Sequence, residues 1–292
     1  MGGWNQYYQR LVFNTTSQEF TSSDQNYFTR SMGSINGQKS ADMRTQAGAS
    51  RVYFSNNFNY NYRMCQYDVN DDSSRRWREM SSQPTSEDMP YSCITSNGED
   101  KVYHINYEGN FAIYDVNRDV WSQGPEAPNT LNSGTMCAYS TVRRYVFWFV
   151  LANNVHYYDD TDDGQGDGMW ATDERLRMGE QRSFGWAVSW YDEQYGFENI
   201  LAIAGDYSVT IDVLDTVAWD MTSYEGLVMG REDMYAVIDN HARIWIFAGA
   251  TDAIEVSDSL YDYYPLNQSI STYRGIYVRT CLCIYRPRTY TV

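Results

Sequence analysis

The stretch Ala112–Trp121 reads AIYDVNRDVW, and versions of it return along the chain at a nearly constant interval. A close relative, CQYDVNDDSSRRW, occupies Cys65–Trp77, and looser ones occupy His156–Trp170, Thr210–Trp219 and Ile254–Tyr264. The closing tryptophans, Trp77, Trp121, Trp170 and Trp219, are 44, 49 and 49 residues apart. A repeat of about 40 to 50 residues built from short strands is typical of a β-propeller, in which each repeat forms one four-stranded blade.

Each repeat also contains a short apolar run that predicts a buried strand. These runs are RVYF from Arg51, KVYHI from Lys101, RYVFWFV from Arg144, NILAIAG from Asn199 and RIWIFAG from Arg243. Gly, Asn and Asp separate the runs, and no helical period persists over three turns. We therefore predict an all-β fold made of four-stranded antiparallel blades.

The two ends of the chain each hold part of a repeat. Residues 1–20 supply the last strands of a blade, with Phe20 where a tryptophan would stand, and residues 272–292 supply two more strands. Pairing of the N- and C-terminal strands in one blade removes exposed sheet edges. We expect residues 1–292 to form a single six-bladed domain whose first blade is split between 1–20 and 272–292.

Charge excludes two classes of partner. The chain carries a formal net charge of −16, from 38 acidic and 22 basic residues. Nucleic acid and anionic membrane surfaces both need clustered Lys and Arg, so neither is expected as a partner. No long apolar run is present, and we expect no membrane insertion.

Cysteines and glycosylation sequons bear on the compartment. Cys93 and Cys137 stand at matching places in successive repeats, where we expect buried free thiols, and no disulfide scaffold or zinc site is predicted. Two N-glycosylation sequons begin at Asn14 and Asn267. They permit an extracellular glycoprotein, and we favour an extracellular over a cytoplasmic location.

The repeat resembles the kelch motif: a diglycine after an apolar strand, then Tyr-Asp, then Trp. The residues that carry it are Gly2-Gly3 with Phe13 and Phe20, Tyr67-Asp68 with Trp77, Tyr114-Asp115 with Trp121, Tyr158-Asp159 with Trp170, and Ile211-Asp212 with Trp219. In two repeats Ala-Gly replaces the diglycine, at Ala204-Gly205 and at Ala248-Gly249. The resemblance implies a propeller whose end loops are free to bind. Many such propellers are interaction modules, and a minority are enzymes that act on sugars or small alcohols.

Enzyme branches of this superfamily need particular side chains. The copper branch, similar to galactose oxidase, needs two His, two Tyr and a Cys joined to Tyr. His104, His156 and His241 fall on different repeats, so we expect them not to converge. A sialidase-like set is not expected either, because the Arg pairs fall in predicted turns and the turn motif of that family is missing. A sugar epimerase would need only a few Arg, Glu or His at one mouth of the axis.

An acidic run offers a candidate metal site. Asp159, Thr161, Asp163 and Asp167 stand at alternating offsets around Gly164, so their oxygens are suited to Ca²⁺. A solvated acidic turn explains the same run. We predict no cofactor, with Ca²⁺ as the one possibility.

Aromatic residues in the turns between second and third strands form the candidate binding set. These are Trp4, Tyr60, Tyr62, Tyr107 and Tyr207, with Asn, Asp and Gln beside them. Planar apolar rings beside directional polar groups suit sugar faces or a protein partner.

The sequence thus supports two functions. The first is a non-enzymatic interaction or structural module that binds a protein partner or self-assembles into a larger assembly or fibre. The alternative is a carbohydrate-binding or carbohydrate-active propeller, of the sugar epimerase or lyase type, with its site at the axial mouth. We expect the first, because no convergent catalytic set stands out.

Overall fold

The fold comes from a computed structural model of the chain. It describes residues 10–14, 19–23, 40–44, 50–58, 61–68, 77–82, 92–106, 109–128, 136–161, 168–192, 197–227, 230, 235–238, 244–247, 260–264 and 269–273. All regular structure in these ranges is β-strand, as the sequence predicts. The described ranges contain no helix able to cross a membrane.

The strands form five four-stranded antiparallel sheets and one two-stranded sheet, each in chain order. The first four-stranded sheet is β3 (Ser40–Arg44), β4 (Ser50–Phe58), β5 (Asn61–Asp68) and β6 (Trp77–Ser82). The second is β7 (Cys93–Ser96), β8 (Lys101–Ile105), β9 (Phe111–Asp115) and β10 (Val120–Gln123). The third is β11 (Met136–Ser140), β12 (Tyr145–Phe149), β13 (Asn154–Asp159) and β14 (Trp170–Arg177).

The fourth sheet is β15 (Trp186–Asp192), β16 (Phe197–Ile203), β17 (Thr210–Asp215) and β18 (Asp220–Glu225). The fifth is β19 (Tyr235–Ile238), β20 (Ile244–Phe247), β21 (Leu260–Tyr264) and β22 (Ser269–Tyr273). The two-stranded sheet pairs β1 (Arg10–Asn14) with β2 (Glu19–Ser23).

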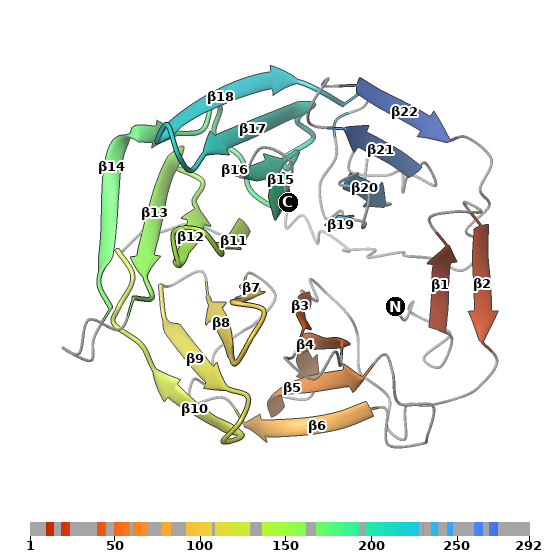
Figure 1. The fold of residues 1–292 in the computed structure, drawn as a ribbon, viewed down its shortest axis with the longest axis vertical. Coiled ribbons are helices and arrows are strands. Elements are labelled where there is room, and N and C mark those ends of the chain that lie inside the picture. Colours follow the sequence, from red (N-terminus) through yellow and green to blue (C-terminus); the bar gives the residue numbers. More distant parts are fainter. Residues whose placement is uncertain are drawn as a thin grey trace, which may run out of the picture.

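The sheets are arranged around one centre, as the blades of a propeller are (Figure 1). The first strands face the centre and contact one another in the series β3, β7, β11, β15 and β19, while the fourth strands lie at the rim. The β1–β2 pair lies on the side between the fifth and first four-stranded sheets (Figure 1). The strands predicted within 274–292 fall outside the described residues, so the sixth blade and its closure stay a prediction.

The repeated tryptophan joins each sheet to the one before it. Within a sheet it pairs with the Tyr of the Tyr-Asp motif, as in Tyr114↔Trp121 and Tyr158↔Trp170. Its indole N–H then leaves the sheet: Trp121 donates to the Ser81 carbonyl at 3.0 Å and Trp170 to the Pro125 carbonyl at 3.1 Å. Trp219 donates to Asp173 Oδ2 at 2.9 Å. Trp121, Trp170 and Trp219 therefore each contact the preceding sheet, which gives the recurrence of tryptophan a structural reason.

Carboxylates make a second set of contacts between sheets. Asp119 accepts from Arg78 at 2.6 Å and from the Ser81 N–H at 3.2 Å in the preceding sheet. Glu198, fully buried on β16, accepts from the Thr141 N–H at 2.9 Å and from the Ser140 hydroxyl. Because a buried carboxylate needs several donors, each of these contacts fixes two neighbouring sheets in one register.

A disulfide joins the first strands of two neighbouring sheets, and the prediction of free thiols is wrong here. Cys93 on β7 and Cys137 on β11 are bonded, with their Cα atoms 5.8 Å apart and a sequence separation of 44. Matching positions on neighbouring inner strands lie side by side near the axis, and this separation falls within the range that a disulfide spans. The spacing of one repeat was the signal, since it places equivalent residues against each other.

Candidate functional site

One end of the propeller holds the turns between second and third strands and the connections from each sheet to the next. We call it the linker end. It includes the described turns 150–153 and 204–209 and the connection 178–185. Of the predicted binding residues, Tyr207 lies in the turn 204–209, half-buried, and Tyr62 lies on β5. Trp4, Tyr60 and Tyr107 lie outside the described residues.

The turn after β16 has an unusual backbone. Four successive residues, Ala204, Gly205, Asp206 and Tyr207, have φ values of 51°, 104°, 47° and 61°. Left-handed φ is costly for residues other than glycine, and such strain is commonly kept where it serves a site. The turn replaces the diglycine of the repeat with Ala-Gly, and it directs Asp206 and Tyr207 to the linker end.

Hydrogen bonds from the neighbouring connection hold this turn in place. The Ser183 N–H donates to Asp206 Oδ2 at 2.6 Å, and the Ser183 hydroxyl donates to the same oxygen at 2.9 Å. The Ser208 hydroxyl donates to Glu180 and accepts from the Thr210 N–H at 2.8 Å. The connection between the third and fourth sheets and the turn of the fourth sheet thus form one rigid unit, which we call the Asp206 turn.

A buried ion pair lies under the Asp206 turn. Arg182 and Asp212 both have fully buried side chains and are paired with each other. Arg182 also donates to the carbonyls of Thr210 and Ala202, each at 2.8 Å, and Asp212 accepts from the Gly179 N–H at 3.0 Å. Burial lowers the pKa of Arg182, and the charges of Asp212 and Glu180 oppose that shift. The guanidinium of Arg182 is therefore bonded to groups inside the protein and does not face a ligand.

Glu180 gives the linker end a second carboxylate. Its side chain is 46% exposed and lies 3.7 Å from Arg182. Burial acts to raise the pKa of Glu180, but hydrogen bonds from Ser208 and Thr210 and the charge of Arg182 outweigh it, so the pKa is lowered. Glu180 is consequently ionised at neutral pH. The surface therefore combines the Glu180 carboxylate, the exposed Asp206 and the phenol ring of Tyr207.

At the opposite end, the predicted calcium segment uses its described oxygens internally. Asp159 Oδ1 accepts from the Thr161 N–H at 2.8 Å and from its hydroxyl at 2.5 Å. Asp163 and Asp167 lie outside the described residues. Among the residues that are described, no three His, Cys, Asp or Glu side chains gather to hold a metal ion.

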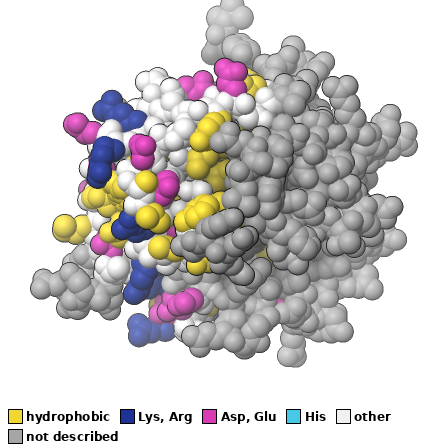
Figure 2. All heavy atoms as spheres, turned by 45° about the horizontal axis from the view of Figure 1, so that its top comes forward, with side chains coloured by type: hydrophobic (Ala, Val, Ile, Leu, Met, Phe, Trp, Pro, Cys, Tyr) yellow, Lys and Arg dark blue, Asp and Glu magenta, His cyan; other side chains and the backbone are white. Residues whose placement is uncertain are grey.

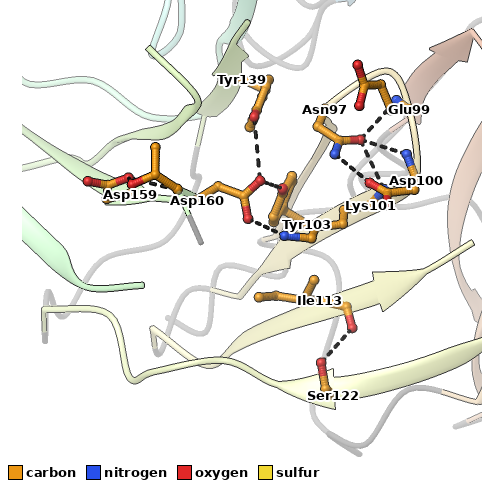
Figure 3. A network of polar contacts seen from close by, with 11 residues as sticks. Asn97, Glu99, Asp100, Lys101, Tyr103, Ile113, Ser122, Tyr139, Asp159 and Asp160 are labelled. Carbon is orange, nitrogen blue, oxygen red and sulfur yellow. Dashed lines mark hydrogen bonds and ion pairs between the residues drawn. The ribbon is translucent and has the colours of Figure 1, made fainter. Parts of the chain in front are cut away.

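Asp160, which the sequence gave no reason to single out, is the acidic residue of this segment that turns inward (Figure 3). It is ion-paired with Lys101 at 2.7 Å and accepts from the Tyr103 hydroxyl at 2.6 Å. The rings of Tyr103 and Tyr139 stack at 5.6 Å beside it. Burial and the charge of Asp160 raise the pKa of Tyr103, so its phenol stays protonated and donates. Asp160 thus joins the second and third sheets.

The two described histidines lie in the interior of different sheets. His104 on β8 is buried, and burial lowers its pKa to about 4. His156 on β13 places Nδ1 2.6 Å from the Thr172 hydroxyl. His241 lies outside the described residues.

Apolar side chains gather at the end opposite the linker end. All six large apolar residues exposed in the described part lie in or beside turns at this end: Val120, Val142, Met169, Tyr191, Val217 and Ile238. Figure 2 shows hydrophobic side chains exposed between basic and acidic groups on one face. The end opposite the linker end therefore exposes apolar side chains among charged groups.

Comparison with known proteins identifies the fold and does not identify a family or an activity. No family model matches the chain, and no curated protein matches it. Among solved structures, it is similar to a novel fungal alcohol oxidase of the AA5 family, in complex with copper, at 14% identity and a TM-score of 0.60. The match covers 90% of this chain and 58% of that chain. At this identity the likeness shows the fold alone, and the chain spans less than two thirds of that protein's length.

This comparison contradicts two predictions. We expected a non-enzymatic module from the kelch-like fold, but the solved structure that shares the fold is an enzyme. We also expected no cofactor, or Ca²⁺, whereas that structure contains copper. Both predictions relied on the absence of recognisable catalytic motifs. Proteins that share a fold can carry different active sites, so this absence does not exclude an enzyme.

The described residues do not fit a copper centre. His104 and His156 are in different sheets, Cys93 and Cys137 are bonded to each other, and no group of three metal-binding side chains forms among the described residues. We therefore derive no step of a mechanism through copper.

Proposed function

We propose that this protein is a carbohydrate-active propeller that binds its substrate at the linker end, against the Asp206 turn. The observation that carries the proposal is the run of four left-handed residues from Ala204 to Tyr207, held by Ser183 and presenting an acidic and an aromatic side chain. A strained turn needs support from its surroundings, and this turn has that support from the preceding connection. The solved neighbour, an alcohol oxidase, supports a substrate that bears hydroxyl groups.

The chemistry of the Asp206 turn suits an uncharged or amine-bearing sugar. Carboxylate oxygens accept hydrogen bonds from sugar hydroxyls, and the face of a tyrosine ring packs against the C–H face of a sugar. The nearest arginine, Arg182, has no exposed side-chain surface, and Arg175 is paired with Asp173 on the outer strand β14. Uronic acids would bring a further negative charge to the carboxylates of Glu180 and Asp206, so we expect them to be rejected.

The reaction we propose is proton transfer on the bound sugar, the step shared by epimerases and lyases. Glu180 is ionised and anchored by Ser208, which makes it the candidate base. Asp206 is held by two donors from Ser183 and positions the substrate. No metal takes part in this proposal.

We further propose that the protein works in an oxidising, extracellular compartment and that its sixth blade closes the ring. The Cys93–Cys137 disulfide supports the oxidising compartment, because structural disulfides persist where thiols are oxidised. The sequon at Asn14, at the end of β1, and the one at Asn267, outside the described residues, are proposed glycan sites.

A second copy of the chain is the partner we propose for the apolar end. Six exposed apolar side chains at one end of a strongly charged protein favour a contact there. Val217→Asp, where the side chain is 60% exposed, should shift a dimer to monomer in sedimentation. A chain that sediments as a monomer before the change would contradict this.

The site is tested by screening saccharides against the folded protein with saturation-transfer NMR. We expect neutral or amino sugars to give signals that Tyr207→Ala abolishes, with uronates silent. Val142→Ala, at the opposite end, is the matched control and should leave the signals unchanged. Signals that survive Tyr207→Ala, or that come only from uronates, would overturn the proposed site.

A further inference from the structure

We infer that the turn Asn97–Gly98 modifies itself, by attack of the Gly98 backbone nitrogen on the Asn97 side-chain amide. The turn connects β7 to β8 at the end opposite the linker end (Figure 3). Attack of this kind converts asparagine to aspartate or isoaspartate without an enzyme. The inference is independent of the proposed carbohydrate site.

Hydrogen bonds already stabilise the oxygen that becomes charged in this reaction. Asn97 Oδ1 accepts from the backbone N–H groups of Glu99, Asp100 and Lys101, each at 3.0 Å. When a nucleophile adds to Cγ, negative charge develops on Oδ1, and three fixed donors then act as an oxyanion hole does. The Asn97 amide is therefore activated in the folded chain.

The leaving nitrogen is held in one orientation, and the residue that carries the nucleophile is a glycine. Asn97 Nδ2 donates to Asp100 Oδ1 at 2.8 Å, which holds the amide in one orientation. Gly98 has a φ of 79°, and no heavy atom lies within 4 Å of the place where a Cβ would stand. Because glycine has no side chain, no side chain of its own shields the Gly98 nitrogen from Cγ.

The steps balance without any further reactant except water. The Gly98 nitrogen forms a bond to Cγ, the bond from Cγ to Nδ2 breaks, and the proton lost by the Gly98 nitrogen leaves with ammonia. The resulting five-membered succinimide then takes up water. Opening at one carbonyl gives aspartate at position 97, and opening at the other gives isoaspartate, in which the backbone runs through the side chain.

The product weakens a contact between sheets. A carboxylate at position 97 has no N–H to donate to Asp100, and two like charges then face each other across that contact. Lys101, next in the strand, is ion-paired with the buried Asp160 of the third sheet. Modification of Asn97 therefore disturbs the junction between the second and third sheets.

The test compares the rate of conversion in the folded and the unfolded chain. The intact protein is incubated in mildly alkaline buffer with and without urea, and peptides containing residue 97 are followed by mass spectrometry with isoaspartate detection. We expect conversion in the folded chain to be several-fold faster, and Gly98→Ala to suppress it in urea as well, where folding plays no part. Equal or slower conversion in the folded chain would overturn the inference and show that the three N–H groups protect Asn97.

Discussion

Single residues connect the sheets of this propeller, and the repeated tryptophan is the clearest case. The indole of Trp170 packs against Phe111 and Trp148, and its N–H reaches the Pro125 carbonyl of the preceding sheet. One side chain thus belongs to the core of one sheet and to the hydrogen bonding of another. This double use explains why the residue recurs while the loops around it vary in length.

Replacement of Trp170 by Phe keeps an aromatic ring but removes the N–H. We expect the free energy of unfolding to fall by about 1 to 3 kcal/mol, because the partly buried carbonyl of Pro125 loses its donor and the smaller ring leaves space. Urea denaturation measures the change. Ser122→Ala, which removes an exposed hydroxyl bond to Ile113 within one sheet, is the control and should have little effect. Equal losses in both variants would contradict the connecting role.

His104 makes stability depend on pH. Its pKa is lowered from 6.5 to about 4 by burial, so the unfolded chain binds its proton at a higher pH than the folded chain does. Stability from the neutral ring is complete above the unfolded pKa and is lost as pH falls through the folded value. We expect a loss of about 3 kcal/mol between pH 6.5 and 4, and His104→Gln should remove that part of the dependence. Identical pH profiles of stability for the wild type and His104→Gln would show that protonation of His104 does not destabilise the folded chain.

At the scale of elements, the sequence predicted the strands well and their cross-connections poorly. Apolar runs such as KVYHI and NILAIAG became the second strands β8 and β16, because burial on both faces is a local signal in sequence. The contact of Asp160 with Lys101 joins residues 59 apart, and nothing local distinguishes Asp160 from the half-buried Asp159 beside it. Of the Asp206 turn, only Tyr207 was predicted as a binding residue. The left-handed φ values of Ala204 and Asp206 could not be predicted, because these residue types do not indicate them.

The inner strands β7 and β11 are tied by the Cys93–Cys137 disulfide. Replacing both residues by alanine should lower the free energy of unfolding by about 3 to 4 kcal/mol, the amount expected from chain entropy for a loop of 44 residues. Thermal or urea unfolding with and without a reducing agent measures this. The wild-type protein should lose stability in the reducing agent, and the double variant should not respond. An unchanged stability of the wild type in the reducing agent would mean that the bond does not form.

For the whole molecule, the two ends of the propeller carry different candidate surfaces. The linker end carries Glu180, Asp206 and Tyr207 on a supported turn, and the other end carries apolar side chains and the Asn97–Gly98 turn. A propeller permits this division because its strands all run between the two ends, so that turns of one type collect on each. The fold is similar to that of a solved alcohol oxidase, and a shared fold does not decide which residues carry out chemistry.

The carbohydrate site is tested most directly by titrating the saccharide that binds best into the Asp206→Asn variant, followed by calorimetry. Asp115→Asn is the matched control, because Asp115 also accepts backbone N–H bonds, from Asn117 and Arg118, but at the opposite end. We predict that Asp206→Asn weakens binding by at least about tenfold, as expected for loss of a charged acceptor, while Asp115→Asn leaves it unchanged. Equal affinity in the wild type and both variants would contradict a site at the linker end.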